Sequence, residues 1–271
     1  MNISGNLTTF KNKVLSIGYP LSSDPSRTQT GYPIGYFYGY VADGLYQNAD
    51  DIANSPVNNV NGGGAKPGDL KYKDLSGKDG KPDGQIDDFD RTMIGNPTPD
   101  FAYGGSLTLT YKSFDLGIDV GGVAGNEIYR VWGTSEQKNS VYNYPAYYAD
   151  AWHGEGTSNS IPIVNAKHLI NRAPSTYGIE NGSYFRIRTI TLGYNLSASA
   201  LAKARIKNLR IFVSIQNLKT FKHNIGYSPE YGGSYDLAED TPPSATSFGI
   251  DYGDANGALP RIISGGINIS F

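Results

Sequence analysis

Six segments of the chain alternate between apolar and polar residues, the pattern of a β-strand whose two faces differ. The clearest is "FAYGGSLTLTY", residues 101–111, where one face is aromatic and aliphatic and the other is small and polar. In "FDLGIDVG", which follows after Lys112 and Ser113, the polar face includes Asp115 and Asp119. Carboxylates on that face indicate a strand whose second side meets water rather than a sandwich core.

The other strands share this pattern less regularly. The final "RIISGGINISF" alternates cleanly, and "NLRIFVSIQN" does so apart from Phe212. In "SYFRIRTITLGYNL" the apolar residues change face part-way, and a β-bulge near Thr189 would restore one apolar face. The first residues, "NISGNLTTFKNKVLSI", form a sixth candidate strand with weaker alternation.

The connections between these strands alternate between long and short. Residues 18–100, 125–182 and 219–259 form long loops, whereas residues 112–113 and about 197–207 form short turns. All long loops therefore lie at one end of an antiparallel sheet, as in outer-membrane barrels, which have short periplasmic turns and long extracellular loops. Aromatic residues near the strand ends match the interfacial girdles of such barrels. The expected fold is all-β: a transmembrane antiparallel β-barrel segment of about six strands with long extracellular loops.

The composition limits the classes of function that the chain can have. The 271 residues include 34 Gly and 21 Tyr, which suits a sheet protein with long loops. A net charge of -2 gives no sign of a nucleic-acid partner, and the absence of Cys excludes disulfides and thiolate metal sites. No signal peptide is expected, because no basic region followed by an apolar run opens the chain. No run of 18 apolar residues predicts a transmembrane helix.

Several stretches together resemble SusC/RagA-type TonB-dependent transporters. "GYPIGYFYGYVADGLYQNADDI" is similar to the family's "G-x-P-x-G-x-x-x-G-Y-x-x-D-G-[IL]-[FY]" pattern. An acidic loop followed by "DRTMIGNPTPDF" resembles its "D-R-x-x-I-G-x-P-x-P-D-[FY]" block. "NGSYFRIRTITLGYNL" and "LRIFVSIQNLKTF" are similar to the strands that follow. The terminal Phe271 is similar to the aromatic end that outer-membrane proteins present as a barrel-assembly signal.

The resemblance implies a barrel of 22 strands, filled by an N-terminal plug and capped by a SusD-type surface lipoprotein. Such a pair imports glycans or peptides across the outer membrane of Bacteroidetes-type Gram-negative bacteria, driven by TonB. Residues 1–271 resemble only the C-terminal part of the barrel, without the plug, and six strands cannot close by themselves. The expected partners are the remaining barrel and plug polypeptide, the SusD-type lipoprotein, TonB through the missing N-terminal part, the lipid bilayer and a glycan or peptide substrate.

The acidic loop within residues 74–90 has the spacing of a calcium loop, in which alternating oxygens surround one hard cation. The candidate metal ligands are its acidic side chains and one carbonyl: Asp74, Asp79, Asp83, Gln85, Asp87 and Asp90. Lys81 stands where a third oxygen is needed, and the prolines of "GNPTPD" exclude a flanking helix, so an EF-hand is not expected. The alternatives are a structural calcium or magnesium ion and a metal-free loop closed by Asx turns.

Aromatic residues gather in the second long loop, where they could stack on sugar rings or line a peptide groove. The candidate ligand-binding residues are Trp132, Tyr142, Tyr144, Tyr147, Tyr148 and Trp152. The alternative is that they pack the loop onto its own barrel or onto a capping lipoprotein. The charged residues expected to face the lumen and to tune its field are Asp115, Asp119, Arg186, Arg188 and Arg210.

No catalytic residues and no enzyme activity are expected. The sequence contains no Gly-x-Ser-x-Gly elbow, His-Glu-x-x-His pair or phosphate loop. The three histidines, His153, His168 and His223, lack ligand spacing and are expected to be solvated or hydrogen-bonded loop residues. The alternatives to an importer are a soluble calcium-stabilised β-sandwich that binds glycans, a secreted carbohydrate-active enzyme fragment, and a barrel recruited as a structural subunit of an outer-membrane complex.

Overall fold

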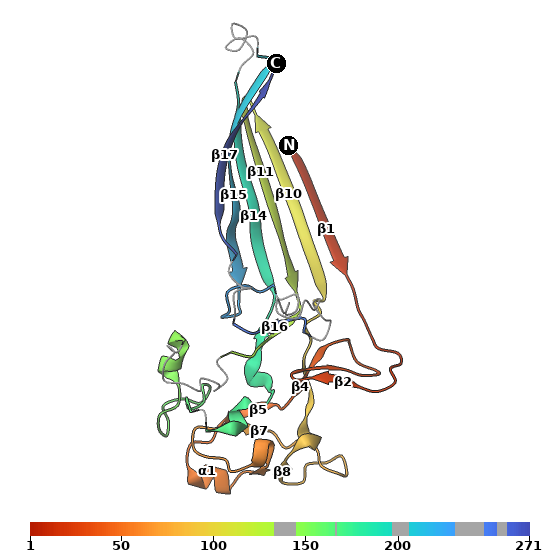
Figure 1. Ribbon diagram of the computed structural model, residues 1–271, viewed down its shortest axis with the longest axis vertical. Coiled ribbons are helices and arrows are strands. Elements are labelled where there is room, and N and C mark those ends of the chain that lie inside the picture. The colour runs from red at the N-terminus through yellow and green to blue at the C-terminus, as the bar shows by residue number, and fades with distance from the viewer. Residues whose placement is uncertain (133–144, 166, 197–205, 231–246, 254–258) are drawn as a thin grey trace, which may run out of the picture.

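The computed structural model describes residues 1–132, 145–165, 167–196, 206–230, 247–253 and 259–271. Six long strands form one antiparallel sheet in the order β1-β10-β11-β14-β15-β17 (Figure 1). Their bounds are β1 Asn2–Thr9, β10 Phe101–Tyr111, β11 Phe114–Ala124, β14 Tyr184–Asn195, β15 Asn208–Lys222 and β17 Ile262–Ser270. Within this sheet every strand pairs with the one before it, which is the arrangement of an up-and-down barrel wall. The predicted six-stranded segment is therefore confirmed.

The long connections form short elements at one end of this sheet (Figure 1). The first contains β2 Leu21–Ser23, β3 Ser26–Thr28, β4 Tyr36–Gly39, β5 Ala42–Leu45, α1 Ala49–Ala53, β6 Val57–Asn58, η1 Val60–Gly62, β7 Leu70–Tyr72, β8 Gln85–Ile86, η2 Asp88–Asp90 and β9 Thr92–Gly95. The second and third contain β12 Glu127–Arg130, η3 Ala146–Asp150, η4 Leu169–Arg172, η5 Thr176–Gly178, β13 Ile179–Asn181 and β16 Ile250–Asp251. Among the described residues, no helix has the length and apolar character needed to cross a membrane.

The pairing register places the apolar faces of neighbouring strands on one side of the sheet. Leu107 lies opposite Ile118, Ile118 opposite Ile190, and Ile190 opposite Ile215. Directly paired residues point to the same side, so these residues form a continuous apolar band across the sheet. Leu192, in the next row of this band, is 51% exposed, which shows that the described protein does not cover it.

The predicted β-bulge is confirmed in β14. Ile187 pairs with Lys219 and Thr189 with Gln216, and the register shifts between these pairs. Arg188 is therefore the extra residue of β14. The bulge brings Ile187 and the preceding Phe185 to the same side as the apolar residues that follow it, which resolves the change of face seen in the sequence.

Two loop boundaries differ from those predicted by more than two residues. β1 ends at Thr9, so the first long loop covers residues 10–100 rather than 18–100. Beyond Thr9 the chain makes other contacts, because the amide N–H of Val14 donates to the carbonyl of Tyr32 at 2.9 Å within the loop itself. The third long loop begins after Lys222, because β15 continues past its bulge.

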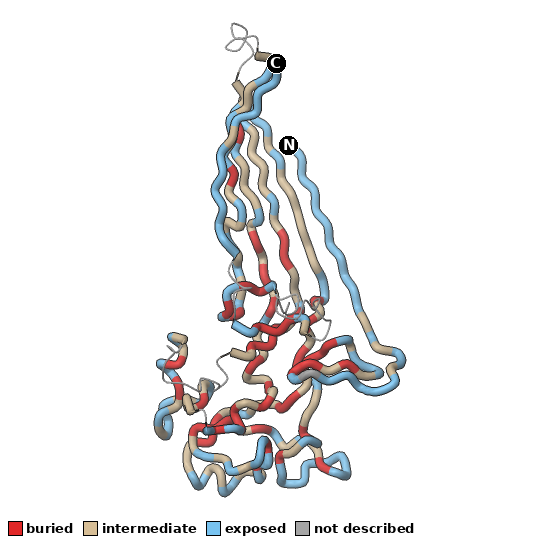
Figure 2. The backbone as a smooth tube through the Cα atoms, in the orientation of Figure 1, coloured by how far each residue is buried: buried red, intermediate tan, exposed pale blue. Residues whose placement is uncertain are grey.

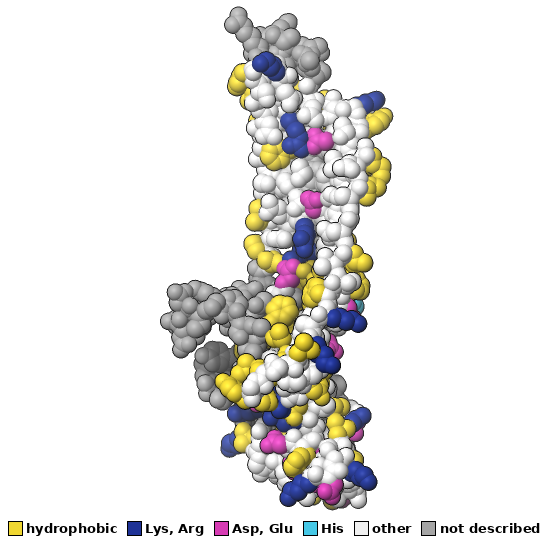
Figure 3. Space-filling model, turned by 90° about the vertical axis from the view of Figure 1, so that its right-hand side faces the viewer, with side chains coloured by type: hydrophobic (Ala, Val, Ile, Leu, Met, Phe, Trp, Pro, Cys, Tyr) yellow, Lys and Arg dark blue, Asp and Glu magenta, His cyan; other side chains and the backbone are white. Residues whose placement is uncertain are grey.

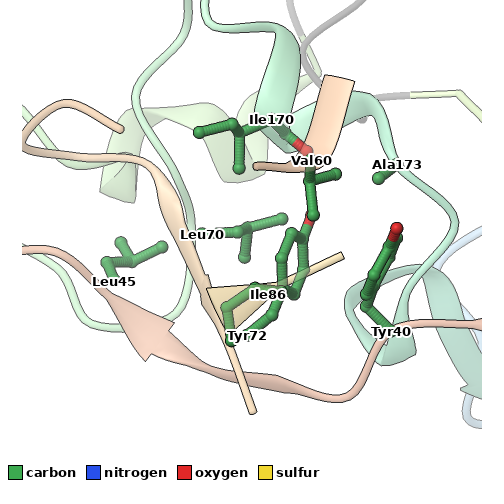
Figure 4. Close-up of a cluster of buried hydrophobic side chains, with 8 residues drawn as sticks. All are labelled: Tyr40, Leu45, Val60, Leu70, Tyr72, Ile86, Ile170 and Ala173. Carbon is green, nitrogen blue, oxygen red and sulfur yellow. The ribbon is translucent and has the colours of Figure 1, made fainter. Parts of the chain in front are cut away.

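Apart from Tyr184 at the start of β14, the buried apolar residues lie in the loops, and Figure 2 shows most buried positions there. One cluster consists of Tyr40, Leu45, Val60, Leu70, Tyr72, Ile86, Ile170 and Ala173 (Figure 4). A second consists of Phe37, Ile94, Tyr129 and Ile250. Because these residues come from all three long connections, the connections form one packed unit, which we call the loop body. It comprises residues 10–100 and the described parts of residues 125–183 and 223–261.

The soluble β-sandwich considered above is wrong for this chain. Its six long strands form a single sheet, whereas a sandwich packs two sheets face to face. The apolar side of the sheet is uncovered among the described residues, as the 51% exposure of Val213 and the 69% exposure of Ile263 illustrate.

Candidate functional site

The side of the sheet opposite the apolar band is mainly polar, with Phe212 as an exception, and we call it the polar wall. Near the short turn, Arg210 donates to both carboxylate oxygens of Asp115, and Asn195 donates to the same carboxylate at 2.9 Å. One row further on, the hydroxyls of Thr191 and Ser214 are 2.9 Å apart. These pairs show that the polar positions of adjacent strands share one face, as predicted.

The middle of the polar wall carries a hollow of about 450 Å³ beside the free edge of β1. Asp119 and Arg188 both line it and both are exposed. The guanidinium of Arg188 lies over Gly121, where a Cβ would be about 2.9 Å from it. Figure 3 shows charged side chains of both signs spaced along the sheet. The polar wall therefore presents the exposed charges of Asp119 and Arg188 to the space beside the sheet.

The loop end of the polar wall is tied to the third long connection. Arg186, only 5% exposed, pairs with the carboxylate of Glu230 and donates to the Thr220 hydroxyl at 2.8 Å. The Tyr184 hydroxyl donates to the other carboxylate oxygen of Glu230. The buried guanidinium is therefore compensated, and the same contacts hold the segment around Glu230 over the sheet.

A cavity of about 240 Å³ lies next to this junction, between the sheet and the loop body. Its lining is mainly apolar and includes Pro97, Pro99 and Phe248, together with the polar residues Asn126 and Glu230. Asn126 is only 8% exposed, and among the described residues its Oδ1 has no hydrogen-bond partner. A mainly apolar cleft with a few polar groups is the usual form of a small-molecule subsite.

Two of the aromatic residues predicted to bind ligand, Trp132 and Tyr147, lie around a buried arginine. Arg130, 4% exposed, donates to Glu180 at 2.7 Å and to the Tyr147 hydroxyl at 3.1 Å. Its guanidinium carbon lies 5.4 Å from the ring centroids of Trp132 and Tyr147. Burial lowers the pKa of Arg130, but Tyr147 and Glu180 outweigh it and raise that pKa above its ordinary value. The group is a permanent cation held by packing.

This arrangement separates the predicted ligand-binding residues. Trp132, Tyr147 and Tyr148 lie together, with the two tyrosine rings stacked at 4.5 Å. Trp152 lies elsewhere, against the first buried cluster, where its indole N–H donates to Gln47 at 3.3 Å. Tyr142 and Tyr144 lie outside the described residues. The described rings serve internal packing, and solute binding by these residues stays a prediction.

The carboxylates of the acidic loop accept hydrogen bonds from backbone N–H groups. Asp74 accepts from the amides of Asp83 and Gly84, at 3.3 and 2.7 Å. Asp90, 1% exposed, accepts from the amides of Leu75 and Ser76, and from that of Asp87 at 2.8 Å. These bonds close the loop without any cation.

This geometry does not fit the predicted calcium site. Among the described residues, no three acidic or histidine side chains are grouped to hold a metal ion. Asp79 is exposed, and Asp83 and Asp87 cap the amides of Gln85 and Phe89, at 3.1 and 2.9 Å. Calcium binding stays a prediction, and calorimetric titration with millimolar calcium tests it.

The sequence analysis missed a buried polar junction in the loop body. His168 Nδ1 lies 2.6 Å from the carboxylate of Asp69, which also accepts from the side-chain amide of Asn171 at 3.0 Å. Asn171 in turn accepts from the amide of Leu70 at 2.7 Å. The junction binds the first long connection to the second. No spacing could reveal it, because about 100 residues separate the partners.

Comparison with known proteins decides the family. No family model matches the chain. Over 257 residues, 94% of its length, the chain is 32% identical to TonB-dependent receptor P3 of Formosa agariphila. Over 98% of its length it is 26% identical to TonB-dependent receptor P26 of the same organism. The chain belongs to the TonB-dependent receptors. It spans only about a quarter of these relatives, 24% and 26% of their lengths.

Solved structures agree on the fold. The RagAB peptide transporter matches 99% of this chain with a TM-score of 0.71 and 18% identity, and the match covers 27% of that chain. The RagAB peptide importer in its open-open state matches with a TM-score of 0.69. The resemblance to SusC/RagA-type transporters is therefore confirmed, and the six strands are a segment of such a barrel. These relatives are receptors and importers rather than enzymes.

The receptor family places this sheet in the outer membrane. The apolar band then faces lipid, and the polar wall faces the barrel lumen, because a transmembrane barrel alternates apolar-out and polar-in. The loop body lies at the end with the long connections, which is the extracellular end of such a barrel.

Proposed function

We propose that the chain is the C-terminal part of a SusC-type transporter that imports glycans or peptides, together with a SusD-type lipoprotein and energised by TonB. The observation that carries the proposal is the two-faced sheet: one side is an uncovered apolar band and the other a charged wall that leads to the loop body. Such a sheet suits a boundary between lipid and an aqueous passage.

The two open edges of the sheet support a larger barrel. Every residue of β1 is exposed, and within the part of the chain that the structure describes β17 pairs on one side only, with β15. Unpaired backbone groups in lipid each cost several kcal/mol, so both edges need further strands. Another segment of the transporter, which is about four times as long in the curated relatives, is the proposed source of these strands.

The proposed passage requires no chemistry on the solute. Asp119 and Arg188 on the polar wall would contact the solute or the plug through exposed charges. The cavity beside Asn126 would hold part of the solute below the loop body. Energy from TonB would then move the plug and release the solute into the periplasm.

Uptake by cells that carry the complete transporter tests this function. Labelled oligopeptides and oligosaccharides are supplied in parallel panels, with and without TonB. We expect TonB-dependent uptake from one panel, and a several-fold lower uptake by the double variant D119N/R188Q. The control I263V changes a lipid-facing residue and should transport normally.

Two results would overturn the proposal. A folded, monodisperse, water-soluble monomer of this chain alone would contradict the membrane barrel. A correctly folded barrel that takes up neither panel would instead support the alternative of a structural subunit in an outer-membrane complex.

A further inference from the structure

An open groove of about 750 Å³ lies at the loop end of the sheet. One row of paired residues crosses it: Tyr103 lies opposite Gly122, Gly122 opposite Phe185, and Phe185 opposite Phe221. The rings of Tyr103 and Phe185 stack at 6.5 Å, and those of Phe185 and Phe221 lie 6.0 Å apart. We call this the girdle groove, because its aromatic row continues the lipid-facing side of the sheet.

Pairing next to the bulge puts a cation on the same lipid-facing side. Val120 lies opposite Ile187, and Ile187 opposite Lys219, so all three side chains point outward. The sequence alternation agrees with this, because Lys219 lies an even number of residues after the lipid-facing Ile215. A lysine at this position is tolerated in a membrane if its ammonium reaches the headgroup region.

The ammonium of Lys219 lies 5.9 Å from the ring centroid of Phe221, one row closer to the loops. His223 is exposed and lines the same groove. Lys222 also lines it, but its ammonium already donates to the carbonyls of Asn224 and Gly226. No Asp or Glu is among the described residues that line the groove. The groove therefore offers two basic groups without an acidic counterpart.

The position of the girdle groove matches the headgroups of the outer leaflet. At the opposite end of the apolar band, Tyr111, Phe114 and Tyr194 form a second aromatic row, in which the last two rings lie 4.8 Å apart. Eight residues of β10 separate the two rows, roughly 27 Å along the strand and roughly 20 Å once barrel tilt is included. That height is close to the apolar band of an outer-membrane barrel, about 25 Å.

We propose that the girdle groove binds the phosphorylated headgroup of an outer-leaflet glycolipid of the lipopolysaccharide type. Lys219 and His223 would pair with phosphate, and the aromatic row would pack against the sugar and the first acyl carbons. Basic pockets beside membrane segments recognise anionic headgroups in this way. The proposal rests on the proposed barrel, since the complete wall must sit in the outer membrane.

Native mass spectrometry of the complete transporter in detergent tests this site. The probes are lipid A with its phosphates, enzymatically dephosphorylated lipid A and inorganic phosphate. We compare the wild type with K219Q, H223Q and the double variant. Lys112 provides the matched control, because its ammonium lies 5.4 Å from the Tyr111 ring in the periplasmic aromatic row. K112Q removes the same kind of cation–aromatic pair from the opposite leaflet.

We expect wild type and K112Q to retain phosphorylated lipid A equally, and K219Q to bind about fivefold more weakly. The double variant should bind no better than K219Q, and dephosphorylated lipid A should bind weakly to all forms. Displacement of the lipid by inorganic phosphate would indicate a free-anion site and overturn the lipid assignment. Equal retention by wild type and the double variant, or an equal loss in K112Q, would also overturn it.

The migration of unheated samples on gels shows whether each variant is a folded barrel, and solute uptake shows whether it transports. K219Q and H223Q should pass both tests. Loss of lipid binding with uptake intact supports the site, whereas failure of the wild-type barrel to fold in membranes would count against the proposed transporter and not against the groove alone.

Discussion

The sheet and the loop body contain the same types of apolar residue, but these are exposed in the sheet and buried in the loop body. In the sheet, Leu192 and Val213 are each 51% exposed, whereas in the loop body Leu70 and Ile86 are 1% and 0% exposed. Figure 2 shows that the buried positions gather below the sheet, among the long connections. This difference in exposure follows from the two surroundings. The apolar side chains of the sheet contact lipid, whereas those of the loop body, which lies in water, must pack against one another.

Charged residues also differ between the two regions in how far they are buried. In the loop body, Arg130 and Asp69 are almost fully buried and each has specific polar partners. On the polar wall, Asp119 and Arg188 are exposed. Burial of a charge without a partner would be costly, so these two buried charges are compensated, whereas exposed charges along a water-filled lumen need no protein partner.

The largest expected effect comes from the core of the loop body. In Figure 4, Ile86 lies within the cluster that includes Leu70 and Tyr72. Ile86→Ala leaves a cavity there and should destabilise the loop body by about 2 to 5 kcal/mol. Limited proteolysis of the complete transporter measures this loss. Ile263→Ala is the matched control on the lipid face, where acyl chains fill the space, and equal sensitivity of both variants would contradict the comparison.

A slightly smaller effect is expected from a charge in the apolar band. Leu109 lies opposite Leu116 on the lipid-facing side, and the neighbouring Thr108 faces the lumen. Leu109→Arg should cost about 2 to 4 kcal/mol, because the guanidinium must enter lipid. Thr108→Arg, on the same strand, should fold almost normally. Urea titration of the barrel in lipid vesicles measures both, and similar destabilisation of the two variants would disprove the assigned faces.

The buried junction of the loop body should respond more weakly. Asp69→Ala leaves the donors of His168 and Asn171 without their shared acceptor, at a cost of about 1 to 3 kcal/mol. The exposed Asp79→Ala is the control and should have no measurable effect. Hydrogen exchange of residues 60–72 and 165–173 reports the loss. Unchanged exchange in Asp69→Ala would show that the two long connections are held together by apolar packing alone.

The smallest effect concerns pH. A hydrogen bond from Lys71 and another from the amide of Gln47 lower the pKa of Asp51 below its ordinary value, against the opposing effect of burial. The contact therefore contributes stability above the unfolded pKa of about 3.9 and loses it as pH falls through the folded value. Wild type should be more protease-resistant than Asp51→Asn at neutral pH, with the difference vanishing in acid. A difference that persists unchanged at about pH 2 would contradict this assignment.

Much of the sheet could be predicted because its signals are local. The period-2 alternation of β10 and β11 assigned their faces, and the break at Thr189 located the bulge to within one residue. The lengths of the connections predicted which end of the sheet carries the long loops and which carries the short turns. β1 was predicted too long, because alternation beyond Thr9 continues in a segment whose hydrogen bonds are made inside the loop.

The candidate site was less predictable. Asp115 and Arg210 could be placed on one face by parity, but their contact spans 95 residues. Tyr147 meets Arg130 from 17 residues further along the chain, and no local pattern encodes that contact. The acidic loop has calcium-like spacing, and its carboxylates accept hydrogen bonds from nearby amides. Those hydrogen bonds depend on the backbone geometry of the loop, which the spacing does not specify.

The sequence by itself determined the strands, the end of the sheet that carries the long loops, and the lipid-facing side, because alternation and connection length are properties of neighbouring residues. Only the tertiary structure decided how the long connections share one core, how Asp69 meets His168, and that Phe185 and Lys219 line one groove. Those outcomes depend on contacts between segments that are distant along the chain and on strand register, and neither leaves a periodic trace in the sequence.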